Sequence, residues 1–158
     1  MNEKKYDSIG KITNILLLVL GGILLLFILV APEIMKLLFS EEYFEAVWTI
    51  PPITLSVYFM FLYSIFSDIE SYLYKTKYIM YASIVCATVN IVLNYFGIIK
   101  FGYIVCGYTT LISYILFAIM HYKFMKKSCI DEGIGEKIFD ENKISILSVI
   151  LIGLMVVF

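Results

Sequence analysis

Residues 12–32 read ITNILLLVLGGILLLFILVAP, a run of 21 residues without Asp, Glu, Lys or Arg. An α-helix rises about 1.5 Å per residue and a bilayer's hydrocarbon core is about 30 Å thick, so this run has the length of one membrane crossing. Three more uncharged stretches follow, at 46–67, 78–99 and 101–122. The sequence therefore predicts an all-α, polytopic transmembrane helix bundle, with four complete crossings within residues 1–127.

A fifth apolar stretch follows Lys143 and reaches Phe158 after only 15 uncharged residues. A transmembrane helix needs about 20 such residues, so we expect residues 144–158 to be the start of a further crossing that is truncated in this chain. The polar segment 128–143 is interpreted as a cytoplasmic linker between the fourth crossing and this helix.

The overall composition agrees with a membrane protein. Hydrophobic residues make up 61% of the chain, against about 45–50% in soluble domains. A net charge of -1 leaves no basic surface for nucleic acid, so no nucleic-acid partner is expected. The three cysteines, Cys86, Cys106 and Cys129, are interpreted as unpaired structural thiols.

The lysines alternate in number along the connecting segments. Three precede the first crossing, one follows it, then two, then one, and four lie between Lys123 and Lys137 after the fourth crossing. Segments rich in lysine lie on the cytoplasmic side by the positive-inside rule. We therefore expect the N-terminus, the turn at Lys75 and the linker to be cytoplasmic.

Three prolines mark helix boundaries. Pro51 and Pro52 stand near the start of the second crossing, where a missing N–H costs little, so they are expected to open that helix or kink its first turn. Pro32 is expected either to end the first helix or to bend it, so that residues 33–39 continue as an amphipathic turn.

No residue pattern indicates an enzyme. His121, the only histidine, lies at the predicted end of the fourth crossing and is interpreted as an interfacial residue. Asp68 and Glu70 are two residues apart and do not share a helical face, and both are expected to be largely solvated. The alternative for Asp68 is that it faces a water-filled cavity. We expect no catalytic residue, no cofactor and no metal site.

Polar side chains near the predicted mid-membrane level are more informative. Asn90 and Asn94 are four residues apart and share one face of the third crossing, while Thr109 and Ser113 lie at similar depth in the fourth. An unpaired amide in hydrocarbon costs several kcal/mol, so this face should meet another helix or water. Either these residues hold helices together, or they line a central aqueous cavity together with Asp68.

Several short segments carry a resemblance to a known family. In chain order they are APEIMKLLF (31–39), EEY (41–43), PP (51–52), KTK (75–77), KFGY (100–103) and TTLISY (109–114). Over residues 12–127 the chain resembles the C-terminal half of bacterial polysaccharide flippases, the O-antigen and capsule lipid-carrier exporters of the MATE-like multidrug/oligosaccharidyl-lipid/polysaccharide superfamily. Two features depart from the family pattern: Ile99 stands where proline is common, and residues 105–107 are bulkier than usual.

This resemblance implies a function and a setting. The expected activity is flipping of an undecaprenyl-pyrophosphate-linked oligosaccharide across the bacterial cytoplasmic membrane by alternating access, in polysaccharide biosynthesis. The expected partners are membrane lipid, the lipid-linked glycan and a missing N-terminal lobe of a two-lobed transporter. This chain has no arginine, so recognition of the pyrophosphate is expected to belong to that lobe.

Two other functions stay open at this level. One is an ion-coupled multidrug or metabolite antiporter of the same superfamily. The other is a non-transporting membrane module or a gene remnant. Whichever holds, these 158 residues alone are not expected to transport, because half a cavity leaves its polar wall facing lipid.

Overall fold

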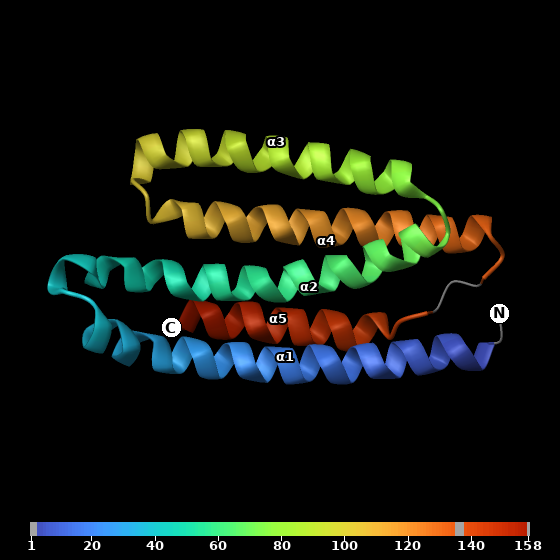
Figure 1. Ribbon diagram of the computed structural model, residues 1–158, viewed down its shortest axis with the longest axis horizontal. Coiled ribbons are helices and arrows are strands. Elements are labelled where there is room, and N and C mark those ends of the chain that lie inside the picture. Colours follow the sequence, from blue (N-terminus) through green and yellow to red (C-terminus); the bar gives the residue numbers. More distant parts are fainter. Residues whose placement is uncertain (1–2, 135–137, 158) are drawn as a thin grey trace.

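The computed structural model of the chain describes residues 3–134 and 138–157, and these contain helices and turns but no strand (Figure 1). The elements in chain order are α1 (Glu3–Leu38), the 3-10 helix η1 (Glu41–Thr49), α2 (Ile50–Tyr72), α3 (Thr76–Phe101), α4 (Val105–Asp131) and α5 (Glu141–Val157). The fold is therefore all-helical, as predicted.

Four segments of the described chain are long and apolar enough to cross a membrane: Ser8–Leu38, Glu41–Tyr72, Thr76–Phe101 and Val105–Asp131. The first three contain the uncharged stretches 12–32, 46–67 and 78–99 and extend beyond them, and the fourth begins at Val105, inside the stretch 101–122, and extends beyond its end. The helices are longer than those stretches because lysine and glutamate are good helix formers, so a charge limits the apolar span without ending the helix. Four predicted crossings are thus found as four long helices.

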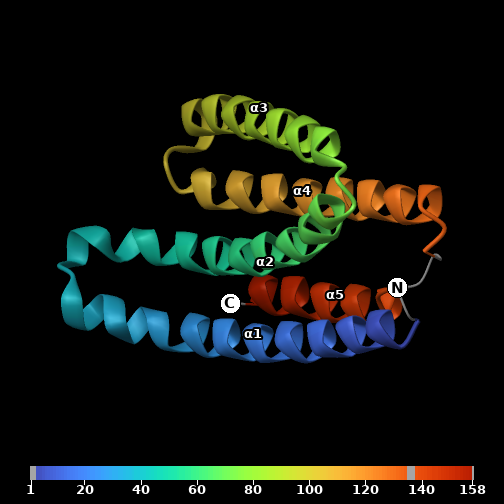
Figure 2. The same cartoon turned by 45° about the vertical axis from the view of Figure 1, so that its right-hand side comes forward.

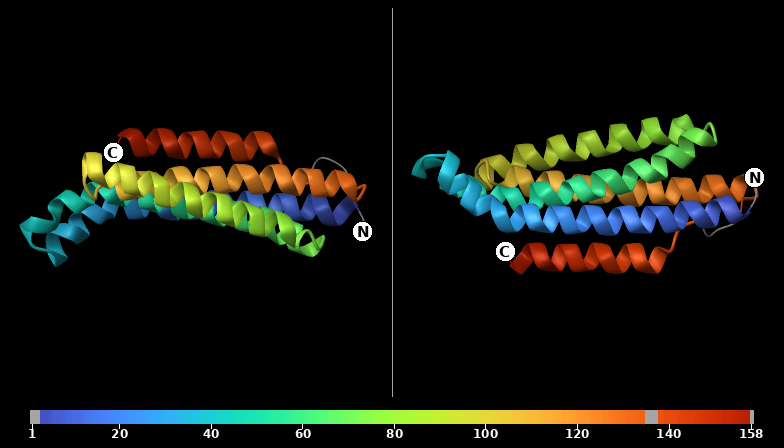
Figure 3. Two further views of the ribbon diagram at one scale, coloured as in Figure 1. Left: turned by 90° about the horizontal axis from the view of Figure 1, so that it is seen from above. Right: turned by 60° about the horizontal axis from the view of Figure 1, so that its bottom comes forward.

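The helices form one layer with a fifth helix against it. The order across the layer is α3, α4, α2 and α1, and Figures 1 and 2 show neighbouring helices running side by side. Figure 3 shows that α5 stands out of this layer, where it packs on α1 and α2. We call the end that carries the start of α1, the α2–α3 turn and the α4–α5 connection the N-terminal end of the bundle.

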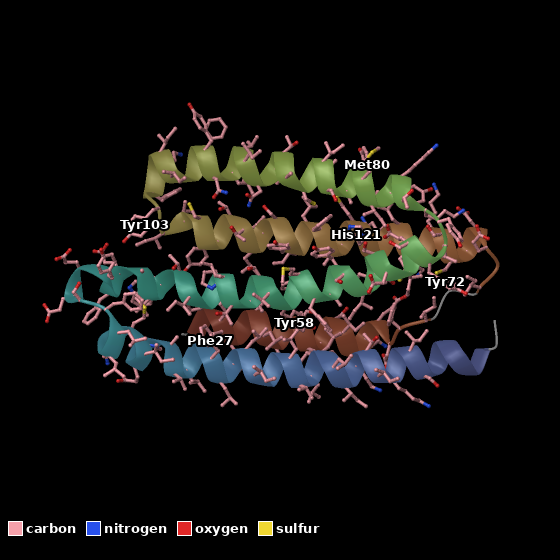
Figure 4. The ribbon with its side chains drawn as sticks, in the orientation of Figure 1. Phe27, Tyr58, Tyr72, Met80, Tyr103 and His121 are labelled. Carbon is pink, nitrogen blue, oxygen red and sulfur yellow. The ribbon has the colours of Figure 1, made fainter. Side chains whose placement is uncertain are left out.

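The core lies mainly in the seam between α2 and α4, which is the most extensive helix contact in the described chain. Its buried apolar residues in these two helices are Leu55, Tyr58, Phe59, Leu62 and Phe66 of α2, and Leu111, Ala118, Met125 and Cys129 of α4. Tyr58 lies between α2 and α5, where its hydroxyl shares a 3.2 Å hydrogen bond with Ser148 (Figure 4). The outer faces of α1 and α3 instead expose large apolar residues such as Leu18 and Ile91, as a surface in contact with acyl chains would.

Two prolines mark the start of α2 and one glycine lets the chain turn after α3, whereas the third proline lies inside α1. Pro51 and Pro52 occupy the first turn of α2, as expected from the sequence. Pro32 does not end α1, which continues through it to Leu38. Gly102 has φ 77° immediately after α3, a left-handed conformation that suits glycine and lets the chain turn back into α4.

The range 128–143, interpreted from the sequence as a linker, overlaps the flanking helices at both of its ends. Helix α4 continues to Asp131 and α5 already begins at Glu141, so the connection between them is shorter than the polar composition indicated. The reason is that polar residues at a helix end remain helical while they are solvated. Glu136 and Lys137, which were part of the predicted linker, lie outside the described residues.

Ion pairs tie the connections together at the N-terminal end. Lys75 of the α2–α3 turn lies 2.8 Å from Glu132, just beyond α4, and the hydrogen bond to Glu132 raises the pKa of the Lys75 ammonium. Near the start of α5, Asp140 lies 3.0 Å from Lys143, whose hydrogen bond lowers the pKa of the Asp140 carboxyl. The first pair joins the α2–α3 turn to the end of α4, and the second is local to the start of α5.

A close approach between α4 and the start of α2 gives a first prediction. A Cβ on Gly107 of α4 would lie 3.1 Å from Pro52 and 3.2 Å from the Thr49 carbonyl, whereas a Cβ on Gly22 of α1 would meet nothing within 4 Å. We expect Gly107→Leu to lower the free energy of unfolding by about 1–3 kcal/mol through overpacking, and Gly22→Leu to leave it nearly unchanged. Unfolding titrations in detergent micelles measure both, and equal losses in the two variants would contradict the packing described.

The Lys75–Glu132 pair gives a second prediction. Because the pKa of Lys75 is raised in the folded chain, the pair stabilises the fold below the ordinary lysine value of 10.5, and this contribution is lost as the pH rises through the raised value. We expect the wild type to melt slightly above Glu132→Gln near neutral pH and the gap to close in strong alkali. A gap in melting temperature that widens with rising pH would be inconsistent with this pair.

Candidate functional site

Two polar clusters lie where α4 packs on its neighbours, one between α4 and α3 and the other between α4 and α2. The first, which we call the amide cluster, contains Asn90, Asn94, Thr109 and Ser113. The second, the buried pair, is Glu70 with His121. Together they place polar side chains in both seams that α4 makes within the layer.

The amide cluster is a hydrogen-bonded chain between α3 and α4. The Asn90 amide donates to the Ser113 hydroxyl at 3.1 Å, and the Asn94 amide donates to Asn90 Oδ1 at 3.0 Å. Thr109 donates to Asn94 Oδ1 at 2.5 Å. Four of the five candidate residues from the sequence thus come together. These bonds use one N–H of each amide, and an amide group carries two.

A groove runs along the amide cluster between α3 and α4. Its volume is about 290 Å³, and its lining residues are Ser83, Cys86, Ala87, Asn90, Thr110, Ser113, Tyr114 and Phe117. Hydroxyl and amide groups together with aromatic rings give a lining that can hydrogen-bond a neutral polyol and stack against its ring. That these residues line a transport path stays a prediction.

The fifth candidate, Asp68, is exposed near the C-terminal end of α2. It takes no part in the hydrogen bonds described for the amide cluster. The structure therefore does not bring Asp68 together with the other four candidates.

The structure overturns the interpretation of Glu70 and His121. Both side chains are 0% exposed, and His121 Nδ1 lies 3.0 Å from Glu70 Oε1. The expectation of a solvated Glu70 and an interfacial His121 is wrong because α4 continues well past the last uncharged residue and packs against α2 along that length. Position 121 is inside a helix seam and not at a helix end (Figure 4).

A signal for this pair was present in the sequence. On α2, Glu70 follows the buried residues Phe59, Leu62 and Phe66 at helical spacing, so it lies on the buried stripe, while Asp68 does not. On α4, His121 lies between Ala118 and Met125 in the same way. Following the apolar stripe beyond the uncharged stretches would have found both residues.

Aromatic rings enclose the buried pair. The imidazole of His121 lies 4.6 Å from the Phe117 ring centroid and stacks on Tyr63 of α2 at 5.6 Å. Within the part of the chain that the structure describes, Glu70 Oε2 and His121 Nε2 have no hydrogen-bond partner. The aromatic enclosure thus holds two ionisable groups, each with one polar atom that is not hydrogen-bonded to another described residue. The described residues contain no group of three or more His, Cys, Asp or Glu placed to hold a metal ion.

The energetic coupling of the buried pair gives a third prediction. Replacing Glu70 or His121 alone by leucine leaves the other group buried without its partner, which costs about 3–5 kcal/mol of unfolding free energy. We expect the double variant Glu70→Leu/His121→Leu to recover much of that loss, because no polar group is then left unpaired. A double-mutant cycle measured by unfolding in micelles tests this, and additive losses would show that the two side chains do not interact.

Comparison with known proteins supports part of the resemblance seen in the sequence. A protein-family model described as MatE matches residues 1–96, which include α1, η1, α2 and most of α3. No curated protein and no solved structure matches the chain. The match confirms the MATE-like superfamily.

Proposed function

The chain belongs to the MatE family of membrane transporters, and from this premise we propose that it is part of a flippase for lipid-linked oligosaccharide. The substrate would be an undecaprenyl-pyrophosphate-linked glycan, moved across the bacterial cytoplasmic membrane for polysaccharide biosynthesis. The short segments that resemble polysaccharide flippases support this class of substrate. Alternating access of two lobes would move the glycan, with this chain in the second lobe.

The amide cluster is the observation that carries the proposal. Its groups are neutral donors and acceptors, and the groove beside it is lined by hydroxyl, amide and aromatic side chains. Sugar hydroxyls need such groups, whereas a cationic drug needs a carboxylate or an aromatic cage and a pyrophosphate needs cations. The groove is therefore suited to the glycan part of the substrate, and the pyrophosphate would be bound by the other lobe.

The proposed orientation places the N-terminal end of the bundle in the cytoplasm. The α2–α3 turn carries Lys75 at this end, and α4 ends there with Lys123, Lys126 and Lys127. At the opposite end, η1 carries Glu41, Glu42 and Glu45 and no lysine. The positive-inside rule supports this direction, and the glycan would then move from the N-terminal end toward η1.

An ion-coupled drug or metabolite antiporter is the second candidate. The buried pair favours it, because an ionisable pair inside a membrane protein commonly marks an ion or proton pathway. The two candidates differ in substrate: cationic dyes would be exported by the antiporter, and lipid-linked sugar by the flippase.

A test in the complete transporter gives a fourth prediction. Asn90→Leu/Asn94→Leu removes the Asn90 amide that lines the groove and the Asn94 amide that is hydrogen-bonded to it, and losing two hydrogen bonds of about 1 kcal/mol each should reduce glycan export at least about tenfold. Val92→Leu, on an exposed position of the same helix, should leave export unchanged. Surface glycan is measured by immunoblot at equal protein abundance in the membrane. Normal export by the double variant would refute the proposed glycan wall.

A further inference from the structure

The role proposed above for the groove makes no use of the buried pair. We propose that Glu70 and His121 form an occluded binding site for one proton in the seam between α2 and α4, and that this proton exchanges with water only when the two helices separate. The proton site stands on the geometry of the pair. Its coupling to glycan movement rests on the proposed function.

The charge of the pair decides how many protons it holds. Both side chains are 0% exposed, so a net charge on the pair would stand in a low-dielectric seam. With Glu70 ionised and His121 neutral the pair carries -1, whereas with one more proton it carries zero. The neutral combination avoids the cost of an uncompensated buried charge. The closed seam therefore favours the proton-loaded pair.

The position of each hydrogen follows from the 3.0 Å contact between His121 Nδ1 and Glu70 Oε1. In the unloaded pair the single imidazole hydrogen must be on Nδ1, where it is donated to the carboxylate, and Nε2 is bare. In the loaded pair Nε2 carries a hydrogen, either because the ring is an imidazolium or because a neutral carboxyl group donates to Nδ1. The proton comes from water on loading and returns to water on release, and no other bond changes.

The two unpartnered atoms distinguish this pair from a purely structural ion pair. A buried ion pair that stabilises a fold has its remaining hydrogen-bonding capacity satisfied by other groups. Among the described residues Glu70 Oε2 and His121 Nε2 have no such partner, although both are fully enclosed. Water entering an opened seam would supply a partner to each atom, and it would stabilise the unloaded pair most, because that pair carries a net charge of -1.

No other ionisable group holds a hydrogen bond to the pair among the described contacts. Tyr63 of α2 stacks on the imidazole and also on Tyr114 of α4. Other ionisable groups on the packed elements include Asp68 and Tyr72 on α2, Tyr78 and Cys86 on α3, Tyr122 and Lys123 on α4, Glu141 on α5, and the Lys75–Glu132 ion pair at the N-terminal end. The pair is thus the proton-binding unit of this seam.

The seam is also suited to couple the proton to movement. Helix α3 packs chiefly on α4, while α1 and α5 pack on α2 and on each other. Separation of α2 from α4 would therefore move α3 and α4 together, and both sides of the amide cluster with them. Loading of the pair closes this seam, and release of the proton accompanies its opening.

The single histidine makes the proton site directly measurable. In the full chain labelled with ¹⁵N-histidine, every imidazole signal comes from His121. We expect the Nε2 signal to be that of a protonated nitrogen at low pH and to become that of a bare nitrogen as the pH rises. Asp131→Asn, an exposed carboxylate on the same helix, should titrate like the wild type, whereas Glu70→Gln should titrate differently. An Nε2 signal that never changes, or a Glu70→Gln titration identical to the wild type, would overturn the proposal.

Coupling is tested separately in liposomes that contain the complete transporter and a lipid-linked oligosaccharide. An imposed pH gradient should accelerate flipping by the wild type and by Asp131→Asn, and Glu70→Gln and His121→Gln should lose this response. If His121 titrates but no glycan moves, the proton site stands and the proposed function fails. If glycan moves and the gradient response is the same in all four proteins, the coupling is refuted while the proposed function stands.

Discussion

The structure depends on one constraint: a polar side chain within a membrane span must find its partner inside the protein, because hydrocarbon offers none. Helix α4 is where this constraint is met. Toward α3 it offers Thr109 and Ser113 to the asparagines of that helix, and toward α2 it offers His121 to Glu70. The two seams fix the order α3, α4, α2 across the layer, α1 completes the layer beside α2, and α5 packs against it.

The number of long helices could be predicted from the sequence, because the thickness of the hydrocarbon core sets the length of an uncharged stretch that crosses it. Uncharged stretches gave the number of long helices, Pro51 and Pro52 marked the start of α2, and the spacing of Asn90 and Asn94 indicated a shared polar face. Helix ends could not be found in this way, because charged residues at a membrane surface continue a helix. The same error hid the buried pair: with α4 taken to end near Tyr122, His121 was assigned to the interface.

The two polar clusters differ in chemistry and are linked through α4 in the proposed account. The amide cluster is neutral and lies beside an open groove, and its residues could be listed from sequence because amides deep in an apolar stretch stand out. The buried pair is ionisable and closed, and which residue meets which across a seam depends on helix rotation that one sequence does not specify. A shift of α4 against α2 would change access to both, which would link proton movement to movement of a polar substrate.

Accessibility of α3 to an aqueous reagent tests most directly whether the polar face turns toward a shared interior. In the complete transporter with Cys86, Cys106 and Cys129 replaced, cysteine is placed at Asn94 or at Ile91, which is 68% exposed on the outer face. The account predicts that a water-soluble maleimide labels position 94 in native membranes and leaves position 91 unlabelled among the acyl chains. Labelling at 91, or none at 94, would contradict it.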